Sequence, residues 1–131
     1  MREDVSRRSR LRLLRPPHVF SFLDLPSSTW VASNDLAFAV RDRFPVTEGH
    51  TLVVPKRVVA TWFEATRQEQ LAILDLIDEV KLALDRELKP DGYNVGFNAG
   101  AAAGQTVMHL HVHVIPRSGQ LRRSEEHTSE L

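Results

Sequence analysis

A regular alternation of histidine with apolar residues constrains the fold of this chain more than any other feature. His109, His111 and His113 occupy every second position, and apolar side chains lie between them. Successive side chains of a β-strand point to opposite faces of the sheet. The pattern therefore predicts a strand over residues 108–115, ended by Pro116, with three imidazoles on one face. Its other face is apolar, and we expect a helix to pack on it.

The clearest helix signal lies between residues 66 and 92. Thr66 is followed three positions later by Glu69, the spacing of a capping box at a helix N-terminus. Apolar residues then recur at steps of three and four, which predicts one buried stripe, and they are Ile73, Ile77, Val80, Leu84 and Leu88. The turn-forming residues 90–92 are predicted to end the helix.

Four further short segments have the character of strands. Residues 29–33 and 36–40 flank Asn34-Asp35, a tight-turn pair that predicts a hairpin. Residues 50–54 and 93–98 supply the remaining two predicted strands. Short links join most neighbours, so we expect an α+β fold: a five-stranded antiparallel sheet with one long helix on one face.

The chain has 131 residues, enough for one domain, which we place at residues 18–121. Residues 1–17 hold six arginines, and we interpret them as a disordered basic arm or as sequence upstream of the true start. An organelle transit peptide is the alternative, which Glu3 and Asp4 oppose. Residues 122–131 look like a translated sequencing adapter, and we interpret them as a non-native tail that is excluded from fold reasoning.

Composition narrows the possible partners. Lys and Arg total 17, as do Asp and Glu, so no net charge favours nucleic acid or a membrane surface. No apolar run reaches the roughly 20 residues that a membrane span needs. The absence of cysteine excludes disulfides and thiolate zinc sites, and it fits a cytoplasmic protein.

Three histidines on one face need more than a structural explanation, because their ring nitrogens would be costly to bury without polar partners. A metal site is one interpretation. The outer two histidines would lie about 13 Å apart along a strand, so a third ligand would have to come from elsewhere, such as His50 or an acid. Attack on phosphorus is the interpretation that we prefer. The central His111 is the natural nucleophile if a backbone carbonyl holds its other nitrogen, while its neighbours orient it and stabilise charge.

The segment just upstream suits an anionic ligand. Residues 100–106 contain Gly100, Gly104 and three alanines, which allow backbone N–H groups to approach an anion closely. Gln105 and Thr106 add neutral donors. We therefore predict that this loop is a phosphate cradle.

Residues 104–117 resemble the signature of the histidine triad family, His-φ-His-φ-His-φ-φ with φ apolar. The resemblance extends over residues 34–55, the helix and residues 93–117, and it is strongest to bacterial diadenosine polyphosphate hydrolases. It implies a homodimer and cleavage at the α-phosphate of a nucleotide, with an adenine nucleotide as the expected substrate. It also implies a covalent nucleotidyl-histidine intermediate, release of a nucleoside monophosphate and no required metal or other cofactor.

The resemblance also assigns residues by position. His111 matches the nucleophile, His113 the residue that contacts the scissile phosphate, His109 the residue that orients the site, and His50 a supporting fourth histidine. Asp42 matches the position that holds the ribose hydroxyls. The remaining matched positions contact the phosphates or line the base pocket, and they are Asn98, Gln105, Thr106, Leu52 and Phe38.

Two departures from the family pattern and two alternatives remain. Residues 20–23 read Phe-Ser-Phe-Leu where many relatives have a Cys-x-x-Cys zinc knuckle, so we expect no zinc there. The tail after Arg117 replaces a segment that often reaches the site. A nucleotide-binding module without turnover and a metal-dependent hydrolase that uses the histidine cluster are the competing hypotheses.

Overall fold

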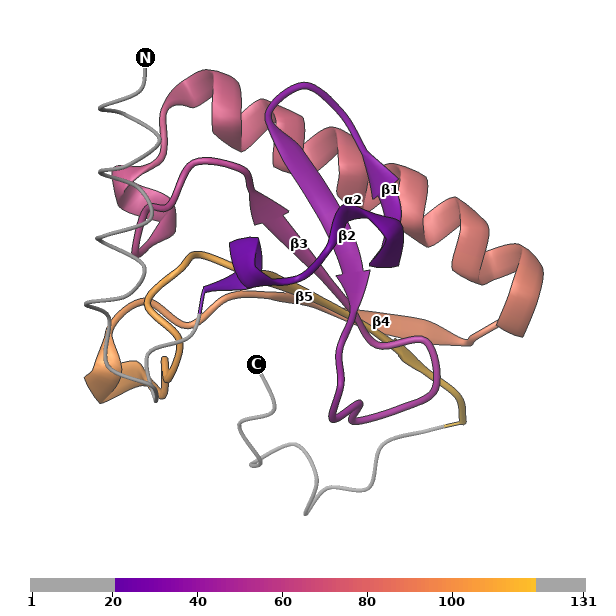
Figure 1. The fold of residues 1–131 in the computed structure, drawn as a ribbon. Coiled ribbons are helices and arrows are strands. Elements are labelled where there is room, and N and C mark those ends of the chain that lie inside the picture. The colour runs from indigo at the N-terminus through magenta and orange to yellow at the C-terminus, as the bar shows by residue number, and fades with distance from the viewer. Residues whose placement is uncertain (1–20, 120–131) are drawn as a thin grey trace.

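The computed structural model describes residues 21–119 of the chain. Five strands form one antiparallel sheet in the order β1-β2-β3-β5-β4, and the long helix α2 crosses one of its faces (Figure 1). This arrangement confirms the predicted α+β architecture. The elements are β1 (Trp30–Ser33), β2 (Ala37–Arg41), β3 (Thr51–Pro55), α2 (Arg67–Leu88), β4 (Gly92–Gly96) and β5 (Val112–Arg117).

The helix begins and ends where the sequence predicts. Glu69 N–H donates to Thr66 Oγ1 over 3.1 Å, and Thr66 N–H donates to a carboxylate oxygen of Glu69 over 2.8 Å, so both halves of the capping box are present. Lys89 adopts the left-handed conformation that closes the C-terminus. Leu76, which lay outside the predicted stripe, is fully buried, whereas Ile77 is only partly buried.

The first hairpin also follows its predicted turn. Asn34 Oδ1 accepts the N–H groups of Leu36 and Ala37 over 3.1 and 2.9 Å, which stabilises the turn between β1 and β2. A side-chain amide of Asn34 additionally donates to the Ala72 carbonyl, so the turn is tied to α2.

The predicted last strand is wrong in its extent. β5 begins at Val112, four residues later than expected, and it continues through Pro116 to Arg117. In a strand the carbonyl and the N–H position of one residue point to the same side. The Pro116 carbonyl accepts Thr47 Oγ1–H, so this side faces away from β4, and the missing N–H of proline removes no hydrogen bond to β4. The chain before Val112 bends instead of pairing, so His109 and His111 precede the strand.

The sheet is covered on both faces, although the sequence predicted a cover on one. Under α2 lies a core of buried residues that includes Val53, Leu76, Leu110 and Val112. On the opposite face, the short 3-10 helix η1 (Phe22–Asp24) contributes to a second apolar cluster, formed by Phe22, Phe38, Val40, Leu52 and Val54. β3 is consequently buried on both sides along its whole length.

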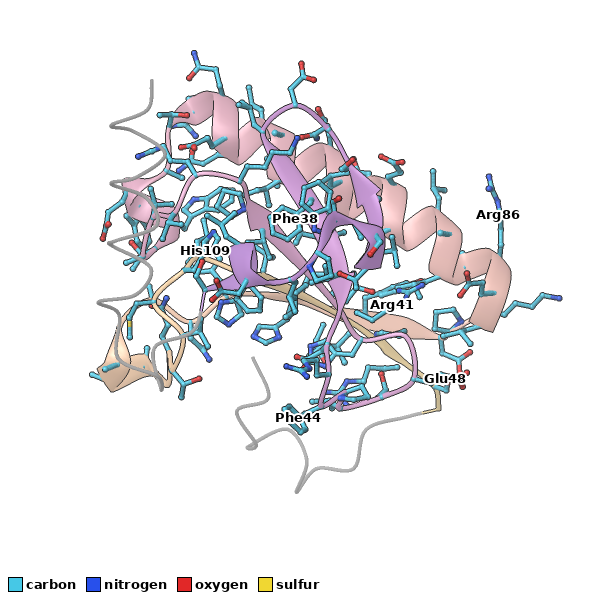
Figure 2. All side chains as sticks on the ribbon, viewed as in Figure 1. Phe38, Arg41, Phe44, Glu48, Arg86 and His109 are labelled. Carbon is cyan, nitrogen blue, oxygen red and sulfur yellow. The ribbon has the colours of Figure 1, made fainter. Side chains whose placement is uncertain are left out.

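The side chains follow this layering. Phe38 and His109 lie inside the molecule, whereas Arg86, Glu48 and Phe44 extend away from it (Figure 2). Within residues 21–119, no helix is long and apolar enough to cross a lipid bilayer. The predicted basic arm at 1–17 and the predicted non-native tail at 122–131 lie outside the described residues.

Candidate functional site: a histidine-lined cavity

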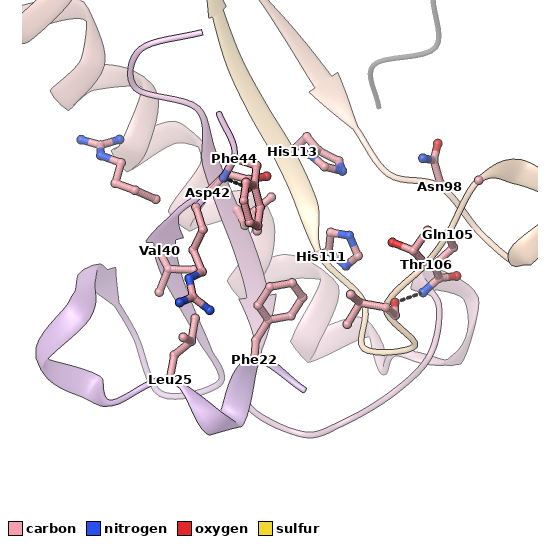
Figure 3. A pocket seen from close by; sticks show the side chains of 15 residues that line it. Phe22, Leu25, Val40, Asp42, Phe44, Asn98, Gln105, Thr106, His111 and His113 are labelled. Carbon is pink, nitrogen blue, oxygen red and sulfur yellow. Dashed lines mark hydrogen bonds between the residues drawn. The ribbon is translucent and has the colours of Figure 1, made fainter. Parts of the chain in front are cut away.

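A cavity of about 430 Å³ opens on the face of the sheet opposite α2. His111 and His113 stand in its wall (Figure 3). On one side of the two histidines the cavity is lined by apolar side chains, labelled Phe22, Leu25 and Val40 (Figure 3). On the other side it is lined by polar side chains, labelled Asn98, Gln105 and Thr106 (Figure 3). The arrangement suits a ligand with one flat apolar end and one anionic end.

Strand pairing builds the junction between these two regions. Val40 of β2 is opposite Leu52 of β3, and Leu52 is opposite His113 of β5. Residues opposite one another in a sheet project to the same face, so two apolar side chains lie directly beside an imidazole. Leu52 therefore lines the cavity.

His111 is held in a single tautomer by its own backbone. Its Nδ1–H donates to the carbonyl oxygen of His109 over 2.8 Å. That carbonyl is accessible because residues 109–111 lie outside the β-ladder, and the Leu110 N–H donates to the Val59 carbonyl over 2.7 Å, which fixes the bend. Burial lowers the pKa of His111 below its ordinary value. The ring is therefore neutral near pH 7, and Nε2 carries the lone pair.

A second chain of hydrogen bonds fixes His113. The Val46 N–H donates to His50 Nδ1 over 3.1 Å, so the proton of neutral His50 must be on Nε2. His50 Nε2 lies 2.9 Å from His113 Nδ1 and donates to it. The remaining proton of His113 is then on Nε2. Burial, reinforced by the neighbouring His111 and His50, lowers the pKa of His113 to about 4.

His109 occupies a different environment from the other two. It is fully buried, and its Nε2–H donates to the Pro55 carbonyl over 2.8 Å. Because the ring proton is on Nε2, Nδ1 accepts the hydroxyl of Ser21 over 3.1 Å, and that hydroxyl oxygen in turn accepts the Leu23 N–H. The side chain of His109 is thus a satisfied core group, and its carbonyl, through His111, is its link to the cavity.

Asp42 lies on the turn that follows β2, at the edge of the cavity. One carboxylate oxygen accepts the Phe44 N–H over 2.9 Å, and the other lies 3.5 Å from His50 Nε2. Asp42 N–H donates to the His50 carbonyl over 2.9 Å. The structure therefore brings together Asp42, His50, His111 and His113.

The Gly100–Gly104 loop has the backbone freedom that its sequence predicts, since both glycines have φ near +95°, a region that side chains disfavour (93° and 97°). Gln105, however, differs from its expected role as a free donor. Its Nε2 donates to the carbonyls of Ala60 and Val107, and its Oε1 accepts the Gly100 N–H. Both amide hydrogens are engaged, so this side chain holds the loop in place.

One predicted base-pocket residue is misplaced. Phe38 does not line the cavity; it is fully buried and stacks on Trp30 with ring centroids 4.4 Å apart. Val40, two positions further along the same face of β2, lines the cavity instead. Strand alternation allows either residue, and only the register of β2 against β3 distinguishes them.

Sequence reasoning missed the contribution of the first described segment. Phe22 lies against His111 and His109, with ring centroids 5.0 and 5.8 Å apart, and Ser21 bonds His109. In the sequence, residues 20–23 indicate only that a Cys-x-x-Cys zinc knuckle is absent there. The rim residues Arg41, Arg43 and Phe44 also line the cavity and carried no sequence signal.

A metal interpretation can be tested against the same hydrogen bonds. Ligand atoms of Asp42, His50 and His113 all lie within 4.8 Å of one another. A metal on His50 Nε2 would displace the proton there, and Nδ1 is already an acceptor for the Val46 N–H. The ring would then have to become an imidazolate, which disfavours ligation by this group.

Comparison with known proteins identifies the family to which this chain belongs. The model of the HIT domain matches residues 17–120, and the chain belongs to this family. The resemblance to the histidine triad signature is thereby confirmed.

Three curated relatives illustrate the family. A HIT-like protein from Mycoplasma pneumoniae is 42% identical over 87 residues, which cover 66% of this chain and 60% of that protein. The AP-4-A phosphorylase of Mycobacterium tuberculosis is 37% identical, with coverage of 68% and 46%. The bis(5′-adenosyl)-triphosphatase of Dictyostelium discoideum is 34% identical, with coverage of 65% and 57%. The matched region thus spans less than two thirds of each relative.

Solved structures agree with the fold. A HIT-like protein from Bartonella henselae, described as involved in cell-cycle regulation, superposes with a TM-score of 0.70 at 31% identity. The match covers 76% of each chain.

Proposed function

We propose that this protein cleaves nucleotides at the α-phosphate through a covalent intermediate on His111 and releases a nucleoside monophosphate. The observation that carries the proposal is the hydrogen bond from His111 Nδ1–H to the His109 carbonyl, which leaves Nε2 unprotonated at the wall of the cavity. A neutral imidazole with a fixed tautomer is a competent nucleophile towards phosphorus. The names of the phosphorylase and triphosphatase relatives support a nucleotide substrate, and we infer an adenine nucleotide.

In this mechanism His111 Nε2 forms a bond to the α-phosphorus as the bond to the leaving group breaks. The leaving group departs with the electron pair, and the ring, which keeps its Nδ1 proton, becomes cationic. The His109 carbonyl stabilises that charge, so His109 acts as a positioning residue. Attack by water or by another acceptor such as phosphate then breaks the N–P bond and restores His111.

The neighbouring groups bind and orient the substrate. His113 Nε2–H donates to an oxygen of the phosphate, and His50 fixes that proton by donating to His113 Nδ1. We assign the ribose hydroxyls to Asp42 and the phosphates to Asn98, Thr106 and the backbone at Gly104. The base would lie on the apolar side of the cavity, beside Leu52.

The decisive experiment uses dinucleoside polyphosphates, nucleoside phosphoramidates and nucleotidyl sugars that carry a radiolabel at the α-phosphate. We expect the wild-type chain to release labelled monophosphate and to yield labelled protein after acid quenching. His111→Asn should bind nucleotide with similar affinity but lose several orders of magnitude in kcat, because the covalent step is lost. His127→Asn, which changes a histidine outside the described residues, is the matched control and should retain both signals.

The competing hypotheses give different results. Nucleotide protection against thermal unfolding without product would indicate a binding module. Activity that a chelator abolishes and one metal restores, with no labelled protein, would indicate metal-dependent hydrolysis. Ordinary turnover by His111→Asn would refute the nucleophile assignment.

We also propose that the protein is a homodimer, as the family resemblance implies, and that it is cytoplasmic, which the absence of cysteine from its sequence supports. Within residues 21–119, β4 lies at an edge of the sheet and its Val95 is 46% exposed, which supports this strand as the contact with a second copy. Light scattering coupled to size exclusion would test the mass, and Val95→Lys should shift it towards the monomer.

A further inference from the structure

The proton on His50 Nε2 lies between two acceptors. His113 Nδ1 is 2.9 Å away, and a carboxylate oxygen of Asp42 is 3.5 Å away. His50 cannot serve both equally, because it has one proton on this side and its other nitrogen is occupied by the Val46 N–H. A small rotation of the ring would move the proton towards the carboxylate.

We propose that Asp42 couples the binding of ribose hydroxyls to the positioning of His113. In the empty site the charged carboxylate competes with His113 for the His50 proton. When ribose hydroxyls donate to Asp42, they occupy its lone pairs and weaken it as an acceptor. His50 then donates to His113 alone, and the Nε2–H of His113 is held in the orientation that the phosphate requires.

The burial of the group makes this competition effective. His50 is 2% exposed and the Asp42 side chain 19% exposed, so water does little to screen their attraction. The second carboxylate oxygen is occupied by the Phe44 N–H over 2.9 Å, and the backbone N–H of Asp42 donates to the His50 carbonyl. These contacts hold the carboxylate beside the imidazole and prevent it from turning away.

The inference deepens the proposed function, since it rests on the assignment of the ribose to Asp42. Asp42 would be a positioning residue as well as a binding residue. The coupling predicts that substrates with both ribose hydroxyls have a higher kcat than substrates without them. If Asp42 only bound the ribose, loss of the hydroxyls would raise KM and leave kcat unchanged.

Asp42→Asn is the informative substitution. The asparagine Oδ1 can still accept the Phe44 N–H, which preserves the turn, while its NH₂ replaces the oxygen that faces His50 and cannot accept a proton. Glu48→Gln is the matched control. Glu48 is an exposed acid of the same loop, and it lines a smaller cavity beside His50.

A spectroscopic experiment tests the coupling without turnover. Long-range proton–nitrogen correlation spectra of isotope-labelled histidines report which nitrogen of each ring carries the proton and how strongly it is hydrogen-bonded. We expect AMP to shift the His50 Nε2 proton and the His113 Nδ1 signal, and 2′,3′-dideoxy-AMP to shift them much less. Asp42→Asn should show the AMP-like His50 signal without ligand, whereas Glu48→Gln should behave as wild type.

Kinetics supply the second test, with an adenylylated substrate and its 2′,3′-dideoxy counterpart at saturation. In the wild type we expect kcat to fall about tenfold on loss of the hydroxyls, the scale of one hydrogen bond to a charged group. In Asp42→Asn the ratio of the two kcat values should approach one. A wild-type ratio of one, or an unchanged ratio in the variant, would overturn the coupling.

The two proposals fail in different ways. Absence of turnover and of labelled His111 would refute the proposed enzyme, while the AMP-dependent histidine signals would still report on the coupling. Normal turnover with identical spectra for AMP and its dideoxy analogue would refute the coupling and leave the enzyme intact.

Discussion

The stability of the protein should depend on pH through His113. Burial lowers the pKa of this side chain from 6.5 to about 4, whereas in the unfolded chain it titrates near its ordinary value. Between these two values the unfolded state binds a proton that the folded state does not, so folding is weakened as the pH falls. Well above pH 6.5 both states are neutral and the effect vanishes.

The magnitude follows from the two pKa values. At pH 5 the unfolded histidine is mostly protonated and the folded one mostly neutral, which lowers the free energy of unfolding by about 2 kcal/mol relative to pH 7.5. His50, His109 and His111 also have lowered pKa values, so the total loss in the wild type should be larger.

Urea unfolding followed by the fluorescence of Trp30 and Trp62 at the two pH values would measure this loss. The comparison with His113→Asn isolates the contribution of one ring, because the carboxyl groups titrate in both proteins. We expect the variant to lose about 2 kcal/mol less than the wild type on acidification. An equal loss in the two proteins would refute the assignment of a buried neutral imidazole at position 113.

Three further substitutions test the fold and the loop. Phe38→Ala should lower the free energy of unfolding by about 3–5 kcal/mol, because it opens a void in the second apolar cluster. Phe63→Ala changes a side chain that is 76% exposed and should have little effect; equal effects of the two substitutions in urea unfolding would contradict a second core on this face of the sheet. Glu69→Ala removes half of the capping box and the carboxylate that two nitrogens of Arg57 contact at 3.0 and 2.7 Å, so it should lower the free energy of unfolding by about 2 kcal/mol. Gln68→Ala, at an exposed neighbouring position, is the control and should leave thermal unfolding unchanged. Gln105→Ala releases the loop from Ala60 and Val107, and steady-state assays should show kcat reduced by about tenfold to a hundredfold; an unchanged kcat would mean that the loop is held without this amide.

The features that could be predicted from sequence are those fixed by local spacing. The capping box at Thr66 and Glu69 and the hairpin turn at Asn34 are set by residues within three positions of one another. The alternation at 109–113 predicted three imidazoles on one face of a strand; His111 and His113 do line the cavity, whereas His109 is buried and half of the expected strand is a bend. The carbonyl that orients His111 belongs to a residue two positions away, so its role could be anticipated as well.

The features that were missed depend on contacts distant in the chain. Ser21 meets His109 across 88 positions, and Gln105 reaches Ala60 across 45. No local pattern indicates either contact. The presence of Val40 instead of Phe38 in the cavity wall has the same origin, because the register of β2 against β3 decides which of these two residues lies beside the cavity.

The double burial of β3 has a consequence for how such a protein can acquire a new ligand. Leu52 and Val40 form the floor of the cavity and are at the same time core residues. Replacing these two residues by smaller ones would enlarge the cavity but would also remove packing that stabilises the fold, so substitutions at the floor are expected to be destabilising. Ligand preference can change with less loss of stability at Arg43 and Phe44 on the rim of the cavity, because these side chains are exposed and their substitution leaves the core intact.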